Sequence, residues 1–92
     1  MIKSFKHKGL EKFYTKGSTA SIQPAHATPI SDRLAFLNAA QTIDDVDKPG
    51  YRLHQLQGDK EDLWAVNVSG NWRIVFKFKD RDAYIVNYED YH

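Results

Sequence analysis

The stretch Ser69-Gly-Asn-Trp-Arg-Ile-Val-Phe-Lys-Phe-Lys-Asp-Arg81 decides the fold, because a strand pattern lies between two turn sequences. Its central part alternates apolar with mostly cationic side chains, which is typical of a strand with one buried face. The apolar face consists of Trp72, Ile74, Phe76 and Phe78, and the opposite face of Arg73, Val75, Lys77 and Lys79. Ser69-Gly70-Asn71 and Asp80-Arg81 are hairpin-turn sequences. We therefore expect a strand, Trp72–Lys79, with an antiparallel neighbour on each side.

Three further strand patterns surround this one: Tyr51–Leu56, Leu63–Val68 and Ala83–Tyr88. In the last of them, one face is expected to carry Tyr84, Val86 and Tyr88, and the other Ala83, Ile85 and Asn87. The charged residues from Asp59 to Asp62 predict a loop, because they follow Gly58 and lack an apolar period.

The N-terminal half has helical patterns instead. His7–Lys16 places Leu10, Phe13 and Tyr14 on one face, and Gly17 is a usual helix stop. The preceding residues, Ile2–Phe5, predict a short strand.

A second helix is predicted from Pro29 to about Ala40. Thr28 is a suitable N-cap, and proline fits the first helical position because its missing N–H has no partner there. The buried face consists of Ile30, Leu34 and Leu37. A start at Pro24 is the alternative, but it would place Pro29 inside the helix, so we expect the earlier turn only as a prefix.

Helices followed by hairpin-joined strands indicate an α+β fold. We expect one domain, residues 1–92, with two N-terminal helices on one face of a mainly antiparallel sheet of four to five strands. The chain has no cysteine, which excludes disulfides and thiolate metal sites. It also lacks a signal-peptide pattern and an apolar run of the ~20 residues that a membrane span needs, so a cytoplasmic protein is expected.

Charge is unevenly distributed along the chain. Residues 1–17 carry five lysines against one glutamate, a local net charge of +4, whereas the whole chain has +1. A basic N-terminal helix is suited to phosphates, although a solvated lysine face explains the same pattern.

The open face of the predicted sheet collects polar and cationic side chains, namely Arg52, His54, Arg73, Lys77 and Lys79. If the last strand pairs beside Trp72–Lys79, the tail adds Asp90, Tyr91 and His92 to this surface. A solvated tail, a water-facing His54 and an Arg73 paired with an acidic side chain are the simpler alternatives. We expect His7 and His26 to be surface residues, and no metal site, since no short histidine spacing such as HxxxH occurs.

Such a surface suits RNA. A guanidinium binds phosphate with two parallel hydrogen bonds, and tyrosine rings stack on unpaired bases. RNA supplies its own nucleophile, the 2′-hydroxyl, so a protein needs a base, an acid and a cation. His54, His92, Asp90 and Arg73 fill those roles without a metal.

Several segments resemble the HigB toxins of the RelE-like family of toxin–antitoxin ribonucleases. They are Met1-Ile-Lys-Ser-Phe-Lys-His-Lys-Gly-Leu10, Tyr51-Arg-Leu-His54, Gly58-Asp59, Asn71-Trp-Arg-Ile74 and Asn87-Tyr-Glu-Asp-Tyr-His92. The resemblance implies a RelE-like fold and cleavage of messenger RNA in the ribosomal A site. It also implies a HigA-type helix-turn-helix antitoxin, through which the pair would repress its operator. With the ribosome as target, we expect the basic N-terminal residues Lys6, Lys8 and Lys12 to help dock ribosomal RNA.

The resemblance assigns Arg73 to the phosphate and to transition-state charge, and Tyr91 to positioning the nucleotide. Asp90 with His54 is placed on the base side and His92 is the acid, although the acid and base labels are exchangeable. Gln55 and Gln57 depart from the family pattern, which has proline and lysine there. A non-catalytic ribosome-binding module and an antitoxin corepressor are the competing functions.

Overall fold

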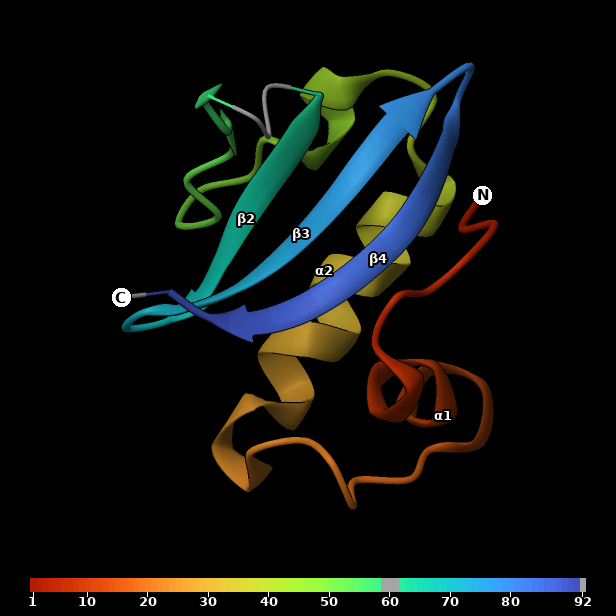
Figure 1. Ribbon diagram of the computed structural model, residues 1–92, viewed down its shortest axis with the longest axis vertical. Coiled ribbons are helices and arrows are strands. Elements are labelled where there is room, and N and C mark those ends of the chain that lie inside the picture. Colours follow the sequence, from red (N-terminus) through yellow and green to blue (C-terminus); the bar gives the residue numbers. More distant parts are fainter. Residues whose placement is uncertain (59–61, 92) are drawn as a thin grey trace.

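A computed structural model describes residues 1–58 and 62–91. A four-stranded antiparallel sheet with strand order β1-β2-β3-β4 follows two helices, which confirms the α+β class (Figure 1). The elements are α1 (Lys8–Lys16), the 3-10 turn η1 (Pro24–His26), α2 (Ala27–Ala39), the 3-10 turn η2 (Ile43–Val46), β1 (His54–Gln55), β2 (Leu63–Ser69), β3 (Trp72–Lys79) and β4 (Asp82–Asp90). Most of the loop predicted from Asp59 to Asp62 lies outside the described residues. No helix in the described part of the chain is long and apolar enough to cross a membrane.

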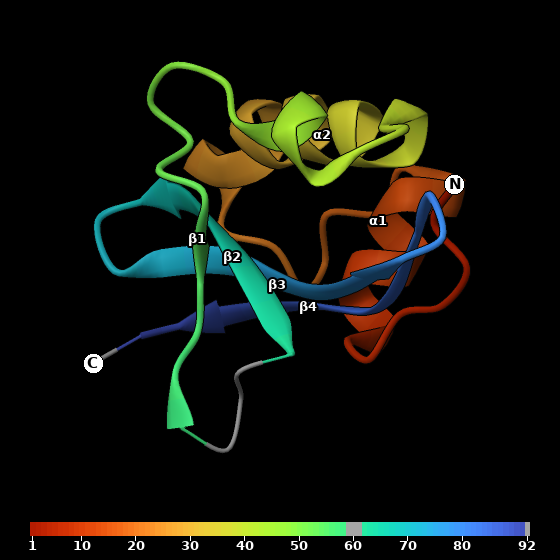
Figure 2. The ribbon, with the colours of Figure 1, turned by 90° about the horizontal axis from the view of Figure 1, so that it is seen from above.

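The core lies between the helices and one face of the sheet. Figure 2 shows α2 lying along that face, and β1 forms the edge of the sheet next to β2. Leu10 of α1 is fully buried, as predicted, and full burial of one such side chain contributes about 1.5–3 kcal/mol. The largest side chains buried with it are Ile30, Leu34, Leu37, Val46, Val66, Ile74, Phe76 and Val86.

The first helix ends as its sequence predicts. Its N-cap is His7, whose Nδ1 accepts a hydrogen bond from the Leu10 N–H at 2.9 Å. Gly17 terminates it with φ +74°, a left-handed conformation in which a side chain is disfavoured, and its N–H donates to the Phe13 carbonyl. The predicted range, His7–Lys16, is thus correct to within one residue.

The second helix begins two residues earlier than predicted. Thr28 is not its N-cap, because α2 starts at Ala27 directly after the η1 turn. Pro29 is the third helical residue, and its missing N–H costs nothing there, because the first-turn N–H groups lack intrahelical partners. The prefix expected near Pro24 is therefore present as a 3-10 turn.

A β-bulge interrupts the pairing of β3 with β4. Val75 pairs with Asn87 but Lys77 pairs with Tyr84, so two residues of β4, Ile85 and Val86, oppose Phe76. Ile85 has φ +48° and is exposed. The strict alternation predicted for this strand is therefore wrong, since the bulge moves Tyr84 away from the buried face that contains Val86.

The N-terminal segment forms the outer border of β4. Ile2–Phe5 is not a regular strand but makes two parallel bridges, from Ile2 to Ala83 and from Phe5 to Val86. Between these bridges, the Ser4 hydroxyl accepts a hydrogen bond from the Ile85 N–H at 2.8 Å. The N-terminal segment thus supplies partners for backbone groups that the bulge displaces from the β3 ladder.

Of the two histidines expected on the surface, His26 is buried and His7 is half-buried. His26 is 8% exposed, and its Nδ1 lies 2.7 Å from the hydroxyl of Tyr88. The rings of His7 and Trp72 also pack against Tyr88, with centroids 5.7 and 4.6 Å away. The surface prediction is therefore wrong for His26 and only partly right for His7, because the residues that begin α1 and α2 pack against the end of the sheet.

Burial raises the pKa of Tyr88, the Gln23 N–H opposes this shift, and the Asp90 charge adds to it. The Tyr88 hydroxyl therefore stays protonated at neutral pH and is available to His26. Replacing Tyr88 by Phe leaves His26 Nδ1 without its partner in a buried site, so we expect a loss of about 1–3 kcal/mol in the free energy of unfolding.

Urea titration followed by circular dichroism measures this loss. The matched control is Tyr84→Phe, which removes a hydroxyl that makes no hydrogen bond within the described residues and should change stability by less than about 0.5 kcal/mol. Equal effects of the two substitutions would contradict the role given to the His26 contact.

Candidate functional site

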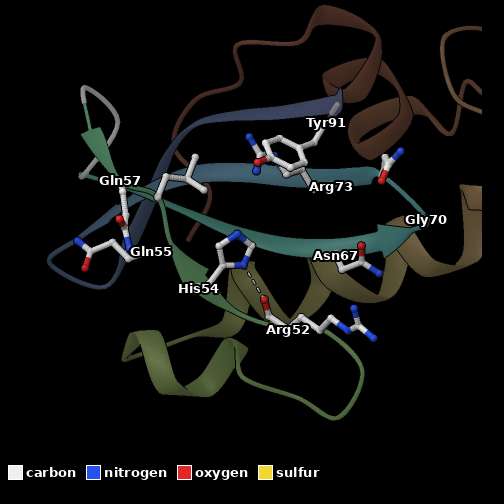
Figure 3. A pocket seen from close by; sticks show the side chains of 10 residues that line it. Arg52, His54, Gln55, Gln57, Asn67, Gly70, Arg73 and Tyr91 are labelled. Atoms are coloured by element: carbon white, nitrogen blue, oxygen red, sulfur yellow. Dashed lines mark hydrogen bonds between the residues drawn. The ribbon is translucent and has the colours of Figure 1, made fainter.

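A cavity of about 610 Å³ opens on the face of the sheet opposite the helices (Figure 3). Chain segments far apart in the sequence meet there: the residues around β1, the β2–β3 hairpin and the residue after β4. The lining residues are Arg52, His54, Gln55, Leu56, Gln57, Asn67, Gly70, Asn71, Arg73 and Tyr91. Four of the residues predicted for the site, Arg52, His54, Arg73 and Tyr91, are therefore brought together.

Arg73 is the most buried charged group of this cavity. Only 8% of the residue is exposed, and its Nε and Nη2 donate to Glu89 Oε2 at 3.3 and 3.0 Å. The Tyr91 ring covers the guanidinium, with its centroid 4.1 Å from Cζ. The alternative considered for Arg73, pairing with an acidic side chain, is thus correct, and Arg73 nevertheless lines the cavity. A cation held over a ring gains about 0.5–2 kcal/mol.

Tyr91 is fixed at its backbone and open at its side chain. Its N–H donates to the Asn71 carbonyl at 2.7 Å, which anchors the chain just beyond β4 to the β2–β3 turn. The residue is 55% exposed. With Arg73 against the ring, Tyr91 offers exposed aromatic surface on which a base can stack.

His54 lies on the opposite side of the cavity and pairs with Ala65 in the sheet. Its Nδ1 is 2.9 Å from the carbonyl oxygen of Arg52. A carbonyl only accepts, so this hydrogen bond assigns the proton to Nδ1. In the neutral ring Nε2 then has the lone pair, which is the requirement for a general base.

The segment that carries Arg52 and His54 is not the full strand predicted for Tyr51–Leu56. Arg52 has φ +51°, which breaks the extended conformation, and only His54–Gln55 pairs as a strand. Backbone bonds fix the segment at both ends, from Asn67 N–H to the Tyr51 carbonyl and from Leu56 N–H to the Leu63 carbonyl.

Apolar packing also covers part of the predicted open face. Leu56 packs with Ala65 and Val75, all buried, and with the half-buried Leu63. Val75 was expected on the open face, and it is on that face but covered by the Leu56 segment. The segment therefore has its own small core, which places His54 beside the cavity.

Arg33 of α2 is a contributor that sequence reasoning missed. Its Nε donates to the Asn67 carbonyl at 2.6 Å, its Nη1 donates to the Pro29 carbonyl at 3.1 Å, and its guanidinium lies 4.1 Å from the Tyr51 ring centroid. The available signal was its position next to Leu34, at the border of the apolar face of the helix. Arg33 thus ties α2 to both ends of the Tyr51–Asn67 contact.

Lys77 and Lys79 do not join the cavity. Both are exposed residues of β3, four and six positions after Arg73, which is roughly 13 and 20 Å along a strand. Lys77 pairs with Leu63 and Tyr84, and Lys79 pairs with Asp82. The predicted group of five polar and cationic residues is therefore divided into the cavity residues and a separate distal pair.

The tail residues also separate. Glu89 is in register with Arg73, whereas Asp90 is in register with Trp72 and so faces the other side of the sheet. Asp90 is exposed and close enough to Tyr88 for its charge to raise that hydroxyl's pKa. His92 lies outside the described residues, so its position relative to His54 stays a prediction.

The basic N-terminal residues lie away from this cavity. Lys6, Lys8 and Lys12 are exposed on and just before α1, whose buried Leu10 belongs to the core on the other face of the sheet. Within the described part of the chain, no group of three or more His, Asp or Glu side chains is arranged to hold a metal ion.

The Arg33 contacts predict that this side chain stabilises the backbone pairing of Tyr51 with Asn67 beside the cavity. Replacing Arg33 by Met keeps much of the bulk and removes the two donors, so the Tyr51–Asn67 pairing should open more often. Hydrogen exchange at the Asn67 amide should become about tenfold faster, since a charge-assisted bond contributes roughly 1.5–3 kcal/mol. The control amide is that of Lys6, bonded to the Val86 carbonyl. Uniform acceleration at both amides would show a global effect instead.

Comparison with known proteins gives consistent results. Residues 3–92 match the family model described as HigB-like toxin, RelE-like toxin of type II toxin-antitoxin system HigB. The chain is 48% identical over 92 residues, covering the full length of both chains, to a protein of Proteus vulgaris named Endoribonuclease HigB. It is 30% identical over 82 residues to Toxin HigB-1 of Vibrio cholerae serotype O1, covering 87% of this chain and 86% of that protein.

The family match extends over nearly the whole chain, and the Proteus vulgaris relative aligns from end to end. The residues around the cavity, from Arg52 to Tyr91, therefore all lie within the matched region. The chain belongs to the HigB-like family of RelE-like toxins of type II toxin–antitoxin systems.

Proposed function

We propose that this toxin is a ribosome-dependent endoribonuclease that cleaves messenger RNA in the ribosomal A site and so inhibits translation. The observation that carries the proposal is the buried Arg73 beneath the Tyr91 ring, in one cavity with His54. The full-length relative named Endoribonuclease HigB supports the same reaction class.

The proposed reaction uses the RNA's own 2′-hydroxyl. A base takes the proton of this hydroxyl, and the oxygen attacks the adjacent phosphorus. A 2′,3′-cyclic phosphate forms, and the bond to the 5′-oxygen breaks as an acid protonates it. Between these steps, the phosphorane carries extra negative charge that a nearby cation stabilises.

The cavity residues fit these roles. His54 Nε2 is the proposed base, because Nδ1 is engaged with the Arg52 carbonyl. Arg73 stabilises the charge on phosphate, and Tyr91 stacks on a base next to the scissile bond. Because side chains fill all these roles, we expect no cofactor.

Two proposed catalytic residues rest on the sequence and the family resemblance, not on the geometry of the cavity. His92 is the proposed acid. Asp90 is the proposed partner of the base, although its register with Trp72 directs it away from the cavity face.

The partners follow from the same proposal. The cognate partner is a HigA-like helix-turn-helix antitoxin, and operator DNA is bound only through the complex. The ribosome is contacted by Lys6, Lys8 and Lys12, with Arg52, Lys77 and Lys79 as further RNA contacts. We propose a single cytoplasmic RelE-like domain, residues 1–92, without membrane association.

The first test measures cleavage of translated messages. Primer extension should map breaks within A-site codons, and the products should end in a 2′,3′-cyclic phosphate. His54→Ala should slow cleavage about 10²–10⁴-fold, as expected for a general base, and Arg73→Ala should slow it at least as much. Ribosome binding should persist in both variants.

The matched control is Gln41→Ala, an exposed position between α2 and η2 that does not line the cavity. Antitoxin added in excess should abolish cleavage by the wild type. Translation arrest with intact messages would instead favour a ribosome-binding module, and absence of any effect on growth would favour a corepressor.

Gln57 allows a test of electrostatic attraction. It lines the cavity at a position where the family pattern has lysine. Gln57→Lys should tighten binding to the programmed ribosome, and the slope of log K against log salt should steepen by about 0.7–0.9 for one added phosphate contact. Gln41→Lys adds the same charge elsewhere and is the control. Identical slopes for both variants would contradict a phosphate beside residue 57.

A further inference from the structure

We propose that Glu89 is a positioning residue, which orients the guanidinium of Arg73 for the scissile phosphate and is itself held by Asn87. This inference rests on the proposed function. Glu89 was not among the residues predicted for the site, because a carboxylate beside a phosphate-binding arginine first suggests competition rather than assistance.

The register of the sheet creates the pair. Arg73 of β3 and Glu89 of β4 are directly opposite each other, on the face that carries the cavity. Both Nε and Nη2 of Arg73 donate to one oxygen, Glu89 Oε2, at 3.3 and 3.0 Å. The other oxygen, Oε1, accepts a hydrogen bond from Asn87 Nδ2 at 3.4 Å. Both oxygens of the carboxylate are thus engaged.

These contacts restrain the guanidinium in two directions. Glu89 holds the edge that contains Nε and Nη2, which limits rotation of the group, and Tyr91 covers one face at 4.1 Å. Nη1 makes no hydrogen bond to the other described residues, so its donors remain for a phosphate. A group fixed before substrate binds does not lose conformational freedom in the reaction, and this favours the transition state.

The negative charge of Glu89 predicts whether this residue affects binding of the message or the chemical step. The carboxylate offsets part of the positive potential of Arg73, so Glu89 adds nothing to attraction of the message. Its contribution is geometric and belongs to the chemical step. Removing it should therefore lower kcat and leave ribosome binding unchanged, or slightly tighter.

A double-mutant cycle with Arg73 tests this inference. Single-turnover cleavage on programmed ribosomes is measured for the wild type, Glu89→Ala, Arg73→Ala and the double variant. We expect Glu89→Ala to slow cleavage about 10–100-fold, a typical loss for a misplaced catalytic group. In the Arg73→Ala background the same substitution should have no further effect, because Glu89 acts through Arg73.

Two conservative variants keep the test informative if Glu89→Ala folds poorly. Glu89→Gln keeps an oxygen acceptor for Arg73 and should recover most of the rate. Asn87→Ala releases only Oε1 and should cost about two- to fivefold, since one long hydrogen bond is lost. Melting temperatures are measured for every variant, and a rate loss that persists equally in the Arg73→Ala background would overturn the inference.

A second readout does not depend on cleavage. The Nε–Hε resonance of Arg73 should be protected from exchange in the wild type and become exchange-broadened in Glu89→Ala. An unchanged resonance would overturn the positioning role even if the rate falls. Absence of cleavage by the wild type would overturn the proposed function, while this resonance would still decide whether Glu89 fixes Arg73.

Discussion

The register between β3 and β4 is the constraint on which the rest of the structure depends. It sets Arg73 opposite Glu89 and Trp72 opposite Asp90, which separates the cavity residues from the buried aromatic ones. The bulge opposite Phe76 is part of this register, because without the extra residue the two ends of the hairpin would not both place apolar side chains on the core face. The site and the core are thus two sides of one pairing.

The side chains on the buried face of β3 and β4 stabilise the end of β4, next to which Tyr91 lies. Tyr88 stacks on Trp72 and is bonded to His26, and His7 packs on its ring. The beginnings of both helices are therefore attached to β4 within three residues of Tyr91. An ordered Tyr91 follows from this anchor together with its backbone bond to Asn71, although a chain end has few neighbours of its own.

Local periodicity was sufficient to predict the fold class, because both helices and the central strand β3 have a clear apolar face and turn sequences separate the strands. Periodicity failed where contacts between residues distant in the sequence determine the local conformation. The Ile85 bulge has hydrogen-bond partners from Ser4, 81 residues away, and the segment after Arg52 packs through Leu56 on Val75, a residue distant in the sequence. Likewise, His26 was predicted on the surface because it is polar, but its hydrogen bond with Tyr88 allows it to be buried.

The sequence predicted most of the residues of the candidate site, but not which face of the sheet each of them lies on. Alternation along β3 correctly placed Arg73 on the open side, and the resemblance added His54 and Tyr91. For residues near the end of β4, membership of the site depends on which face of the sheet each side chain is on. The register places Glu89, not Asp90, beside Arg73. This favours His54 as the base, because its Nδ1 bond to a main-chain carbonyl keeps Nε2 free to accept a proton in the neutral ring. An acid must then come from another group, and the family resemblance assigns that role to His92.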